Sequence, residues 1–267
     1  MLLAIDCGNT NIVFAVYQNP NEKSEPLTWR YQTNTKTTAD EYASWLLPLL
    51  SNANINFSDL THVLVSSVVP DVNFNLKKMC AKYFEADLDF ISPDGSNSGL
   101  SINLPQPIKI GADQIVNAVA ALEKYSAPCV VIDFGTATTF DIVNEEGSFI
   151  GGVIAPGVNL SVDAMYRAAA LLPKVQIEKP DHIIGQNTIE AMQSGLYWGY
   201  VSMIEGIACR VSDEMGVKPT FIATGGLANV FTHNMDVIDH AEPLLTLEGL
   251  RLIHCRNHGA DTLKSVA

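Results

Sequence analysis

One short motif occurs at the start of each half of the chain. The stretch LLAIDCGNTN begins at Leu2, and CVVIDFGTATT begins at Cys129. In both, an apolar run leads into Ile-Asp-x-Gly and then into small hydroxyl or amide residues, so that Asp6 aligns with Asp133 without a gap. A single Ile-Asp-x-Gly is common, but its recurrence at the same place in both halves predicts that one domain has been duplicated.

The order of predicted elements repeats with the motif. In the first half, apolar periodicity predicts strands over 2–6, 12–18, 28–33, 62–69 and 87–92, and helices over 39–52 and 70–84. In the second half, it predicts strands over 129–133, 139–144, 148–154, 220–224 and 236–239, and helices over 159–172, 188–214 and 246–257. Residues 93–107 are rich in Gly, Ser, Asn and Pro and predict a long loop. The predicted fold class is therefore α/β, with two related domains over 1–111 and 112–267.

Composition limits the partners and the compartment. A chain of 267 residues, 47% of them hydrophobic, is long enough for two cores. The net charge of −13 argues against sequence-independent binding of nucleic acid, and we expect no nucleic-acid partner. The N-terminus lacks the basic region of a signal peptide, and no apolar run is long enough to span a membrane. Five scattered cysteines without Cys-x-x-Cys suit unpaired thiols, so a cytoplasmic location is predicted.

The Asp-x-Gly turns have a chemistry of their own. Glycine lets a ligand approach the backbone closely, although it also suits an ordinary hairpin turn. The carboxylates of Asp6 and Asp133 suit a hard cation such as Mg²⁺. Backbone N–H groups and nearby hydroxyls suit phosphate oxygens; the hydroxyls are those of Thr10, Thr136 and Thr138. A third element, FIATGGLANVF, is a predicted strand that leads into Gly225-Gly226, where a nucleotide would meet bare backbone.

These three elements, in this order, resemble the acetate and sugar kinase, Hsp70 and actin superfamily. That resemblance implies two ribonuclease H-like domains of duplicated βββαβαβ type, with ATP in a cleft between them. Over nearly its whole length the chain resembles type III pantothenate kinases, through DCGNTN, GADQIVNAVAA, DFGTATTFDIV, GGVIAPGVNLS, NTIEAMQSGLYWGY and ATGGLA. The resemblance implies phosphorylation of pantothenate by ATP to 4′-phosphopantothenate, the first step of coenzyme A synthesis. It also implies Mg²⁺, a monovalent cation (K⁺ or NH₄⁺) and a homodimer.

The resemblance assigns roles residue by residue. Asp113 takes the place of the proton acceptor, Asp133 that of the monovalent-cation ligand, and Thr136 that of an ATP-phosphate contact. The ATP-binding segment comprises Asp6, Cys7, Gly8, Asn9, Thr10, Asn11, Ile12 and Val13. The substrate-contact positions are Leu104, Gly111, Ala112, Asp113, Gln114 and Thr188.

The residues themselves allow two interpretations of Asp113. It falls in the first turn of a predicted amphipathic helix, where a carboxylate gains about 0.3–1 kcal/mol from the helix dipole. That gain alone explains an acidic residue at this position. The dipole should also keep the carboxylate ionised, as a base that accepts a proton from a hydroxyl must be.

The chain departs from the family pattern next to this residue. Where the family reads Gly-x-Asp-Arg, this sequence has Gly111-Ala112-Asp113-Gln114, and a neutral amide replaces a charged fork that suits a carboxylate. Lys109 or backbone N–H groups would compensate. Alternatively, Gln114 marks a kinase for another small hydroxylated acid, or a nucleotide-binding regulatory protein without kinase activity. Leu104 likewise replaces an aromatic residue of some relatives.

Two further groups of residues have simpler explanations. His254 and His258 have a metal-like spacing, but without an evident third ligand we expect a solvated or helix-capping pair. Tyr197, Trp198 and Tyr200 are packing residues of the core or of a subunit interface, and the long apolar helix that carries them favours the interface.

Overall fold

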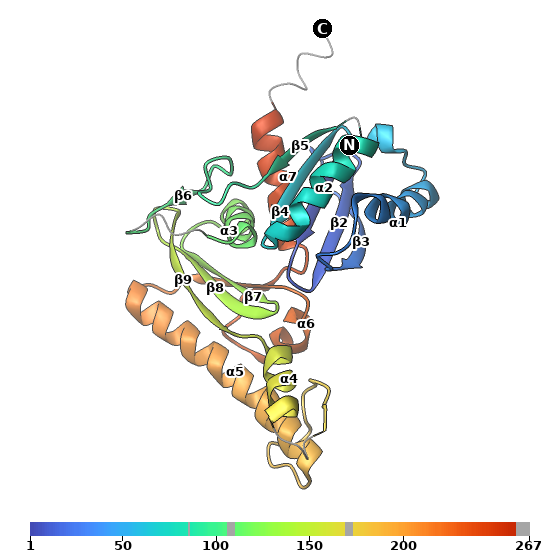
Figure 1. Ribbon diagram of the computed structural model, residues 1–267. Coiled ribbons are helices and arrows are strands. Elements are labelled where there is room, and N and C mark those ends of the chain that lie inside the picture. The colour runs from blue at the N-terminus through green and yellow to red at the C-terminus, as the bar shows by residue number, and fades with distance from the viewer. Residues whose placement is uncertain (85, 106–109, 169–172, 260–267) are drawn as a thin grey trace. The chain divides into compact units, whose positions relative to one another are not determined.

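The computed structural model describes residues 1–84, 86–105, 110–168 and 173–259. They fold into two compact units (Figure 1). The first unit contains the described residues of Met1–Ser101, Pro105–Ala120 and Thr246–Ala267, and the second contains Ile102–Leu104 and those of Ala121–Leu245. The units interleave along the sequence, and the domain division predicted after residue 111 stays a prediction.

The first unit is built on a five-stranded sheet in the order β3-β2-β1-β4-β5. Its strands are β1 (Leu2–Cys7), β2 (Asn11–Tyr17), β3 (Leu27–Gln32), β4 (His62–Ser67) and β5 (Asp87–Phe90). The central strand β1 pairs antiparallel with β2 and parallel with β4. Nearly all of β1 is buried, as its continuous apolar sequence requires, and Asp6 lies close to its carboxyl end.

Helices cover both faces of this sheet. On one face, a core of alternating strand residues packs against α1 (Ala39–Asn52), α2 (Pro70–Tyr83) and the segment around η1 (Phe57–Asp59). Thr38 and Glu41 form a capping box that starts α1, and Pro70 starts α2. On the other face, the ring of His62 on β4 contacts α7 (Leu245–His258). Helix α3 (Ala112–Tyr125) lies so close to α7 that a Cβ on Gly249 would collide with α3 backbone.

The second unit is built on a six-stranded sheet in the order β11-β10-β7-β8-β9-β6. Its strands are β6 (Ser101–Ile102), β7 (Cys129–Phe134), β8 (Ala137–Val143), β9 (Ser148–Pro156), β10 (Thr220–Thr224) and β11 (His240–Ala241). As in the first unit, the strand with the motif, β7, pairs antiparallel with the next strand and parallel with a later one, β10. The two sheets confirm the predicted α/β class with a repeated strand order.

One strand prediction and one loop prediction in this sheet need correction. The predicted strand over 236–239 is wrong, because pairing with β10 begins only at His240. The Asp239 carboxylate instead accepts a hydrogen bond from the Phe221 N–H at 2.9 Å and occupies the place of a ladder partner. The long loop predicted over 93–107 contains the short strand β6, and residues 106 and 107 lie outside the described residues.

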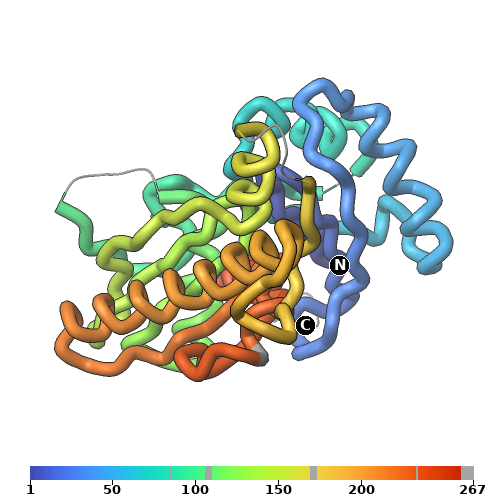
Figure 2. The backbone as a smooth tube through the Cα atoms, turned by 90° about the horizontal axis from the view of Figure 1, so that it is seen from below, coloured from blue at the N-terminus to red at the C-terminus, as the bar shows by residue number. Residues whose placement is uncertain are grey.

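The helices of the second unit are α4 (Val158–Ala168), α5 (Thr188–Met215), α6 (Ala228–Phe231) and the turn η2 (Thr232–Asn234). Asn187 caps α5 by accepting a hydrogen bond from the Glu190 N–H at 3.0 Å, and Gly216 ends the helix in the left-handed conformation. Figures 1 and 2 show α5 running along one face of the second sheet. The last four residues of the helix predicted over 159–172 lie outside the described residues. No helix within the described ranges combines the length and apolar character needed to cross a membrane.

The aromatic residues of α5 belong to the core. Tyr197 is fully buried and Tyr200 nearly so, and both rings pack against Phe231. The preference for a subunit interface is therefore wrong for these two tyrosines, because the helix is long enough to cover the sheet with its apolar face. Trp198, on the neighbouring face, is half-buried.

Candidate functional site

The first Asp-x-Gly motif forms the tight turn between β1 and β2. Gly8 donates its backbone N–H to the Asn11 carbonyl at 3.0 Å, and the Thr33 hydroxyl donates to the Gly8 carbonyl at 2.6 Å. A Cβ on Gly8 would lie 3.3 Å from the Asn11 oxygen, so glycine keeps the turn this tight. Asn9, Thr10 and Asn11 are exposed. The turn therefore presents backbone and small polar side chains to solvent, as a phosphate site requires.

The predicted ATP-binding segment divides into exposed and buried residues. Cys7 and Ile12 point into the core of the first unit. Burial raises the pKa of the Cys7 thiol to about 11, so this cysteine is a protonated core residue at neutral pH and no nucleophile. These two residues can reach a ligand only through their backbone. Asp6 and Val13 are half-buried.

The second motif forms the equivalent turn between β7 and β8. Gly135 donates its N–H to the Ala137 carbonyl at 3.1 Å, the counterpart of the bond in the first hairpin. Gly157, ahead of α4, donates to the Thr136 carbonyl at 3.2 Å. A Cβ on Gly157 would collide with the carbonyl oxygens of Gly135 and Thr136, so the stretch before α4 packs backbone to backbone on the turn. Thr136 remains exposed.

One predicted phosphate contact is excluded. Thr138 is fully buried, and its hydroxyl forms a hydrogen bond with the Tyr200 hydroxyl of α5. Successive residues of a strand point to opposite faces, and Thr138 is on the face that α5 covers. The prediction is wrong for Thr138, whereas Thr10 and Thr136 keep exposed positions in their turns.

The Gly-Gly turn lies against the second motif. After β10 ends at Thr224, Gly225 adopts a φ of +93°, a conformation that L residues other than glycine rarely adopt. A Cβ on Gly225 would collide with Oδ1 of Asp133, so the carboxylate of Asp133 rests on this turn. An added Cβ on Gly226 would meet nothing within 4 Å. Gly226 therefore presents bare backbone, as predicted for a nucleotide contact.

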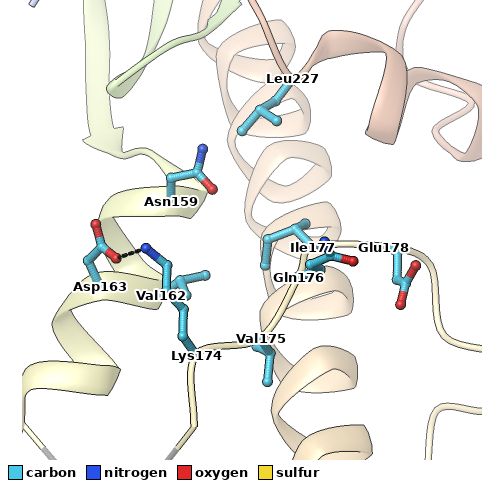
Figure 3. Close-up of a pocket in the computed structure, with 9 residues that line it drawn as sticks. All are labelled: Asn159, Val162, Asp163, Lys174, Val175, Gln176, Ile177, Glu178 and Leu227. Atoms are coloured by element: carbon cyan, nitrogen blue, oxygen red, sulfur yellow. Dashed lines mark ion pairs between the residues drawn. The ribbon is translucent and has the colours of Figure 1, made fainter. Parts of the chain in front are cut away.

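A cavity of about 380 Å³ opens beside this turn in the second unit. Figure 3 shows α4 on one side, the segment from Lys174 to Glu178 on another, and Leu227 above. Asp163 and Lys174 form an ion pair at 2.9 Å along its wall. The lining residues are Asn159, Val162, Asp163, Lys174, Val175, Gln176, Ile177, Glu178 and Leu227. Its size falls within the range of small-molecule sites. The segment 174–178 has no motif, so only the fold brings it beside Leu227.

Asp113 is held over the N-terminus of α3. Its Oδ1 accepts a hydrogen bond from the Gln114 N–H at 2.8 Å. A Cβ on Gly111 would collide with the same oxygen, so glycine makes room for the carboxylate. Burial raises the pKa of Asp113 above its ordinary value, and the backbone N–H bonds offset this only in part. Burial therefore opposes the ionised form that the helix dipole was expected to favour. A raised pKa also brings a general base closer to neutral pH.

Gln114 has a structural partner of its own. Its Oε1 accepts a hydrogen bond from the Gly111 N–H at 3.1 Å, which is half of a capping box. An arginine at this position has no acceptor and cannot form this bond. Ala112 is buried and offers only its backbone. Lys109, the suggested compensating charge, lies outside the described residues.

The remaining substrate-contact positions belong to the second unit. Leu104 is half-buried, and a Cβ on Gly151 of β9 would lie 3.9 Å from its side chain. Thr188 is the exposed first residue of α5. The structure thus gives each predicted residue a position in its own unit, and the substrate roles of Leu104 and Thr188 stay predictions.

The donor groups fit Mg²⁺ bound together with a nucleotide. Within the described ranges, no three His, Cys, Asp or Glu side chains come together to hold a metal ion. Mg²⁺ usually keeps several waters and takes one or two carboxylates plus substrate phosphates. A half-buried Asp6 beside an exposed turn provides one such carboxylate.

The histidine pair has a third member that the sequence did not reveal. The ring of His62 on β4 lies 4.9 Å from that of His254 and 4.8 Å from that of His258. His254 is buried and not solvated. Only the pairing of α7 with the sheet brings His62 to the other two, and spacing along the chain gives no indication of it.

Two α/β units, each with an Asp-x-Gly turn on its central strand, define a protein of the acetate and sugar kinase, Hsp70 and actin class. The dehydratase activator of Clostridium difficile, solved with bound ADPNP, shares this fold with a TM-score of 0.57 and 12% identity, over 100% of this chain and 98% of that one. The family model for type III pantothenate kinases matches residues 2–210, and the chain belongs to this family.

Curated relatives agree with the family model over nearly the full length. The type III pantothenate kinase of Rhodospirillum rubrum is 49% identical over 257 residues, which are 96% of this chain and 99% of the relative. That of Paramagnetospirillum magneticum is 48% identical, over 96% of this chain and 98% of the relative.

Proposed function

We propose that this protein transfers the γ-phosphate of ATP to pantothenate and forms 4′-phosphopantothenate, the first step of coenzyme A synthesis. The observation that carries the proposal is the Asp113 carboxylate, which Gly111 and the first turn of α3 hold half-buried. It lies within the region that the family model covers. A carboxylate in this setting is a suitable proton acceptor for a hydroxyl.

The reaction needs little covalent chemistry from the protein. The primary hydroxyl of pantothenate attacks the γ-phosphorus, its proton passes to Asp113, and ADP leaves. Catalysis in such a transfer depends on positioning and on neutralising charge. When bound, Mg²⁺ supplies the positive charge that offsets the phosphate oxygens. A raised pKa suits Asp113 for this role, because a carboxylate that is more basic than an exposed aspartate accepts a proton more readily.

The ATP contacts follow from the turns. We assign the segment Asp6–Val13 and Thr136 as contacts to the phosphates of ATP. Asp6 would be a ligand of Mg²⁺, and Asp133 would be a ligand of K⁺ or NH₄⁺. The cavity beside Leu227 suits the adenosine end, because it adjoins the Gly225-Gly226 turn and has the volume of a small-molecule site.

The substrate contacts are assigned to the positions around Asp113 and to Leu104 and Thr188. The Gln114 amide oxygen accepts a hydrogen bond from the Gly111 N–H, and we assign the NH₂ group of the same amide as the donor to the substrate. A neutral donor binds a carboxylate less strongly than arginine does. This feature favours one second candidate, a kinase that accepts another small hydroxylated acid.

We also propose a homodimer in the cytoplasm. Seven of the large apolar side chains exposed on the described surface belong to β9, α4 and the start of α5 with the segment before it: Ile150, Ile154, Leu160, Tyr166, Ile183, Ile184 and Ile189. We propose that these side chains form the subunit interface, because a contiguous apolar patch on a protein surface marks an interaction site. The five cysteines are unpaired, which suits a reducing compartment. Sedimentation velocity tests the dimer, and a monomer at micromolar concentration would contradict it.

Product analysis tests the kinase proposal. Purified protein is incubated with ATP, Mg²⁺ and K⁺, with and without pantothenate, while ADP is followed by an enzyme-coupled assay and the product by mass spectrometry. We expect pantothenate-dependent ADP release and a product of the mass of 4′-phosphopantothenate. ADP release with another hydroxy acid only would favour the second candidate. Nucleotide binding without any acceptor-dependent release would favour the regulatory alternative.

A further inference from the structure

Each motif aspartate has a hydroxyl residue beside it on the neighbouring parallel strand. In the first sheet, Asp6 on β1 is in register with Ser66 on β4. In the second sheet, Asp133 on β7 is in register with Thr224 on β10. The two pairs occupy equivalent places in the two units, although nothing in the order of the sequence relates Ser66 to Thr224.

Residues in register on parallel strands project from the same face of the sheet, and the strands lie about 4.8 Å apart. The side chain of Ser66 is therefore the lateral neighbour of Asp6, and that of Thr224 the lateral neighbour of Asp133. Both hydroxyl residues are buried, with exposed fractions of 0% and 1%. From these positions they do not meet a ligand directly, but they border a carboxylate that does in the proposed function.

A separate observation in each unit supports this relation. In the first unit, the hydroxyl of Ser66 has no hydrogen-bond partner among the described residues, which is a costly state for a buried polar atom. In the second unit, the absent Cβ of Gly225, directly after Thr224, leaves the space into which Oδ1 of Asp133 fits. The Asp133 carboxylate thus leans toward the end of β10.

We propose that Ser66 and Thr224 are positioning residues, which donate a hydrogen bond to Asp6 and to Asp133 when these carboxylates hold their cations. A hydroxyl that binds one carboxylate oxygen fixes the orientation of the other, as partners of metal-bound carboxylates commonly do. This inference rests on the proposed function, in which Asp6 serves Mg²⁺ and Asp133 serves K⁺. It predicts that each hydroxyl affects one cation and not the other.

The test removes one hydroxyl at a time. Ser66→Ala and Thr224→Val are compared with wild type for the activation constants of Mg²⁺ and K⁺, with the product quantified directly by mass spectrometry. Ser66→Ala should raise the Mg²⁺ constant roughly tenfold and leave that of K⁺ unchanged, and Thr224→Val should do the reverse, on the usual scale for such partners. Calorimetry of ATP binding at varied Mg²⁺ and varied K⁺ provides a readout that does not depend on turnover.

Matched controls separate the hydrogen bond from packing. Ser67→Ala removes a hydroxyl from the same strand end that is bonded to Asn73 instead, and Thr220→Val removes one from the far end of β10. Both should leave the two constants unchanged. Ser66→Thr and Thr224→Ser keep the hydroxyl and should behave as wild type. These two variants still test the inference if a variant without the hydroxyl fails to fold.

The outcomes are distinct. The inference is supported if Ser66→Ala shifts only the Mg²⁺ constant, Thr224→Val shifts only the K⁺ constant, and Ser66→Thr and Thr224→Ser shift neither. No shift, equal shifts for both cations, or the same shifts in Ser66→Thr and Thr224→Ser would overturn it. If wild-type protein makes no phosphorylated pantothenate, the proposed function fails, and the calorimetric comparison still decides the roles of Ser66 and Thr224.

Discussion

Acidification should destabilise the first unit through its cluster of three imidazole rings. Burial, followed by the charges of His258 and His62, lowers the pKa of His254 from 6.5 to about 4. The folded protein thus excludes a proton that the unfolded chain binds below about pH 6.5. Stability therefore falls as the pH drops from about 6.5 toward 4 and levels off below that value.

Neighbouring charges lower some pKa values in this cluster and raise others. The amino group of Met1 lowers the pKa of His254 and of His62, whereas Asp87 and Asp89 on β5 raise that of His62. The net pKa of His62 is also lowered, with burial as the main cause. For His254 alone, a difference from 6.5 to about 4 corresponds to about 3 kcal/mol, of which about 2.5 kcal/mol falls between pH 7 and pH 4.5. This is a large part of the 5–15 kcal/mol that is typical for a folded protein.

Urea unfolding at pH 7 and pH 4.5 measures the effect. We compare wild type, His254→Gln and the control His182→Gln, which changes an exposed histidine. Wild type and the control should lose about 2–3 kcal/mol more than His254→Gln on acidification, and the amide protection factors in α7, corrected for the intrinsic exchange rate at each pH, should fall with the same dependence. Equal losses in all three proteins would refute the assignment.

Three further predictions concern the site. Because burial raises the pKa of Asp113, the acidic limb of kcat/KM should have its midpoint above about 4, and a limb at or below that value would contradict the assignment. Gln114→Arg should lower the KM for pantothenate but not for its alcohol analogue. The same variant loses the acceptor for the Gly111 N–H, so urea unfolding should show a loss of about 1 kcal/mol of stability. Gln114→Glu keeps that acceptor as the control, and equal stability of both variants would refute the capping role. Gly225→Ala should destabilise the protein by about 1–3 kcal/mol and weaken ATP binding in calorimetry, whereas Gly226→Ala has open space and should do neither.

The duplicated fold was predictable because each half begins with the same motif and the same strand order. The apolar runs of β1 and β7 are short and continuous, as in strands that are buried on both faces of a sheet. The strand at His240 was misplaced, because a short edge strand has little periodicity. The Asp239 side chain, and not a strand residue, accepts the hydrogen bond from the Phe221 N–H just before this strand.

The candidate site was predictable only as a set of motifs. Local sequence indicated the turns, Asp113 and Gln114, but it did not reveal that Gln114 caps α3 or that burial raises the pKa of Asp113. Thr138 was misassigned because its direction depends on which face α5 covers. The neighbours Ser66 and Thr224 depend on strand pairing, since register is a property of the sheet and not of any one segment.

Turnover of Asp113→Asn tests the central claim most directly. The exchange keeps the size of the side chain and removes the proton acceptor, so pantothenate-dependent turnover should fall by roughly 10²-fold or more. ATP binding by calorimetry and the unfolding profile should stay close to wild type. Asp71→Asn, an exposed aspartate in the first turn of α2, serves as the matched control and should keep full turnover. Near-normal turnover of a folded Asp113→Asn protein would contradict the account.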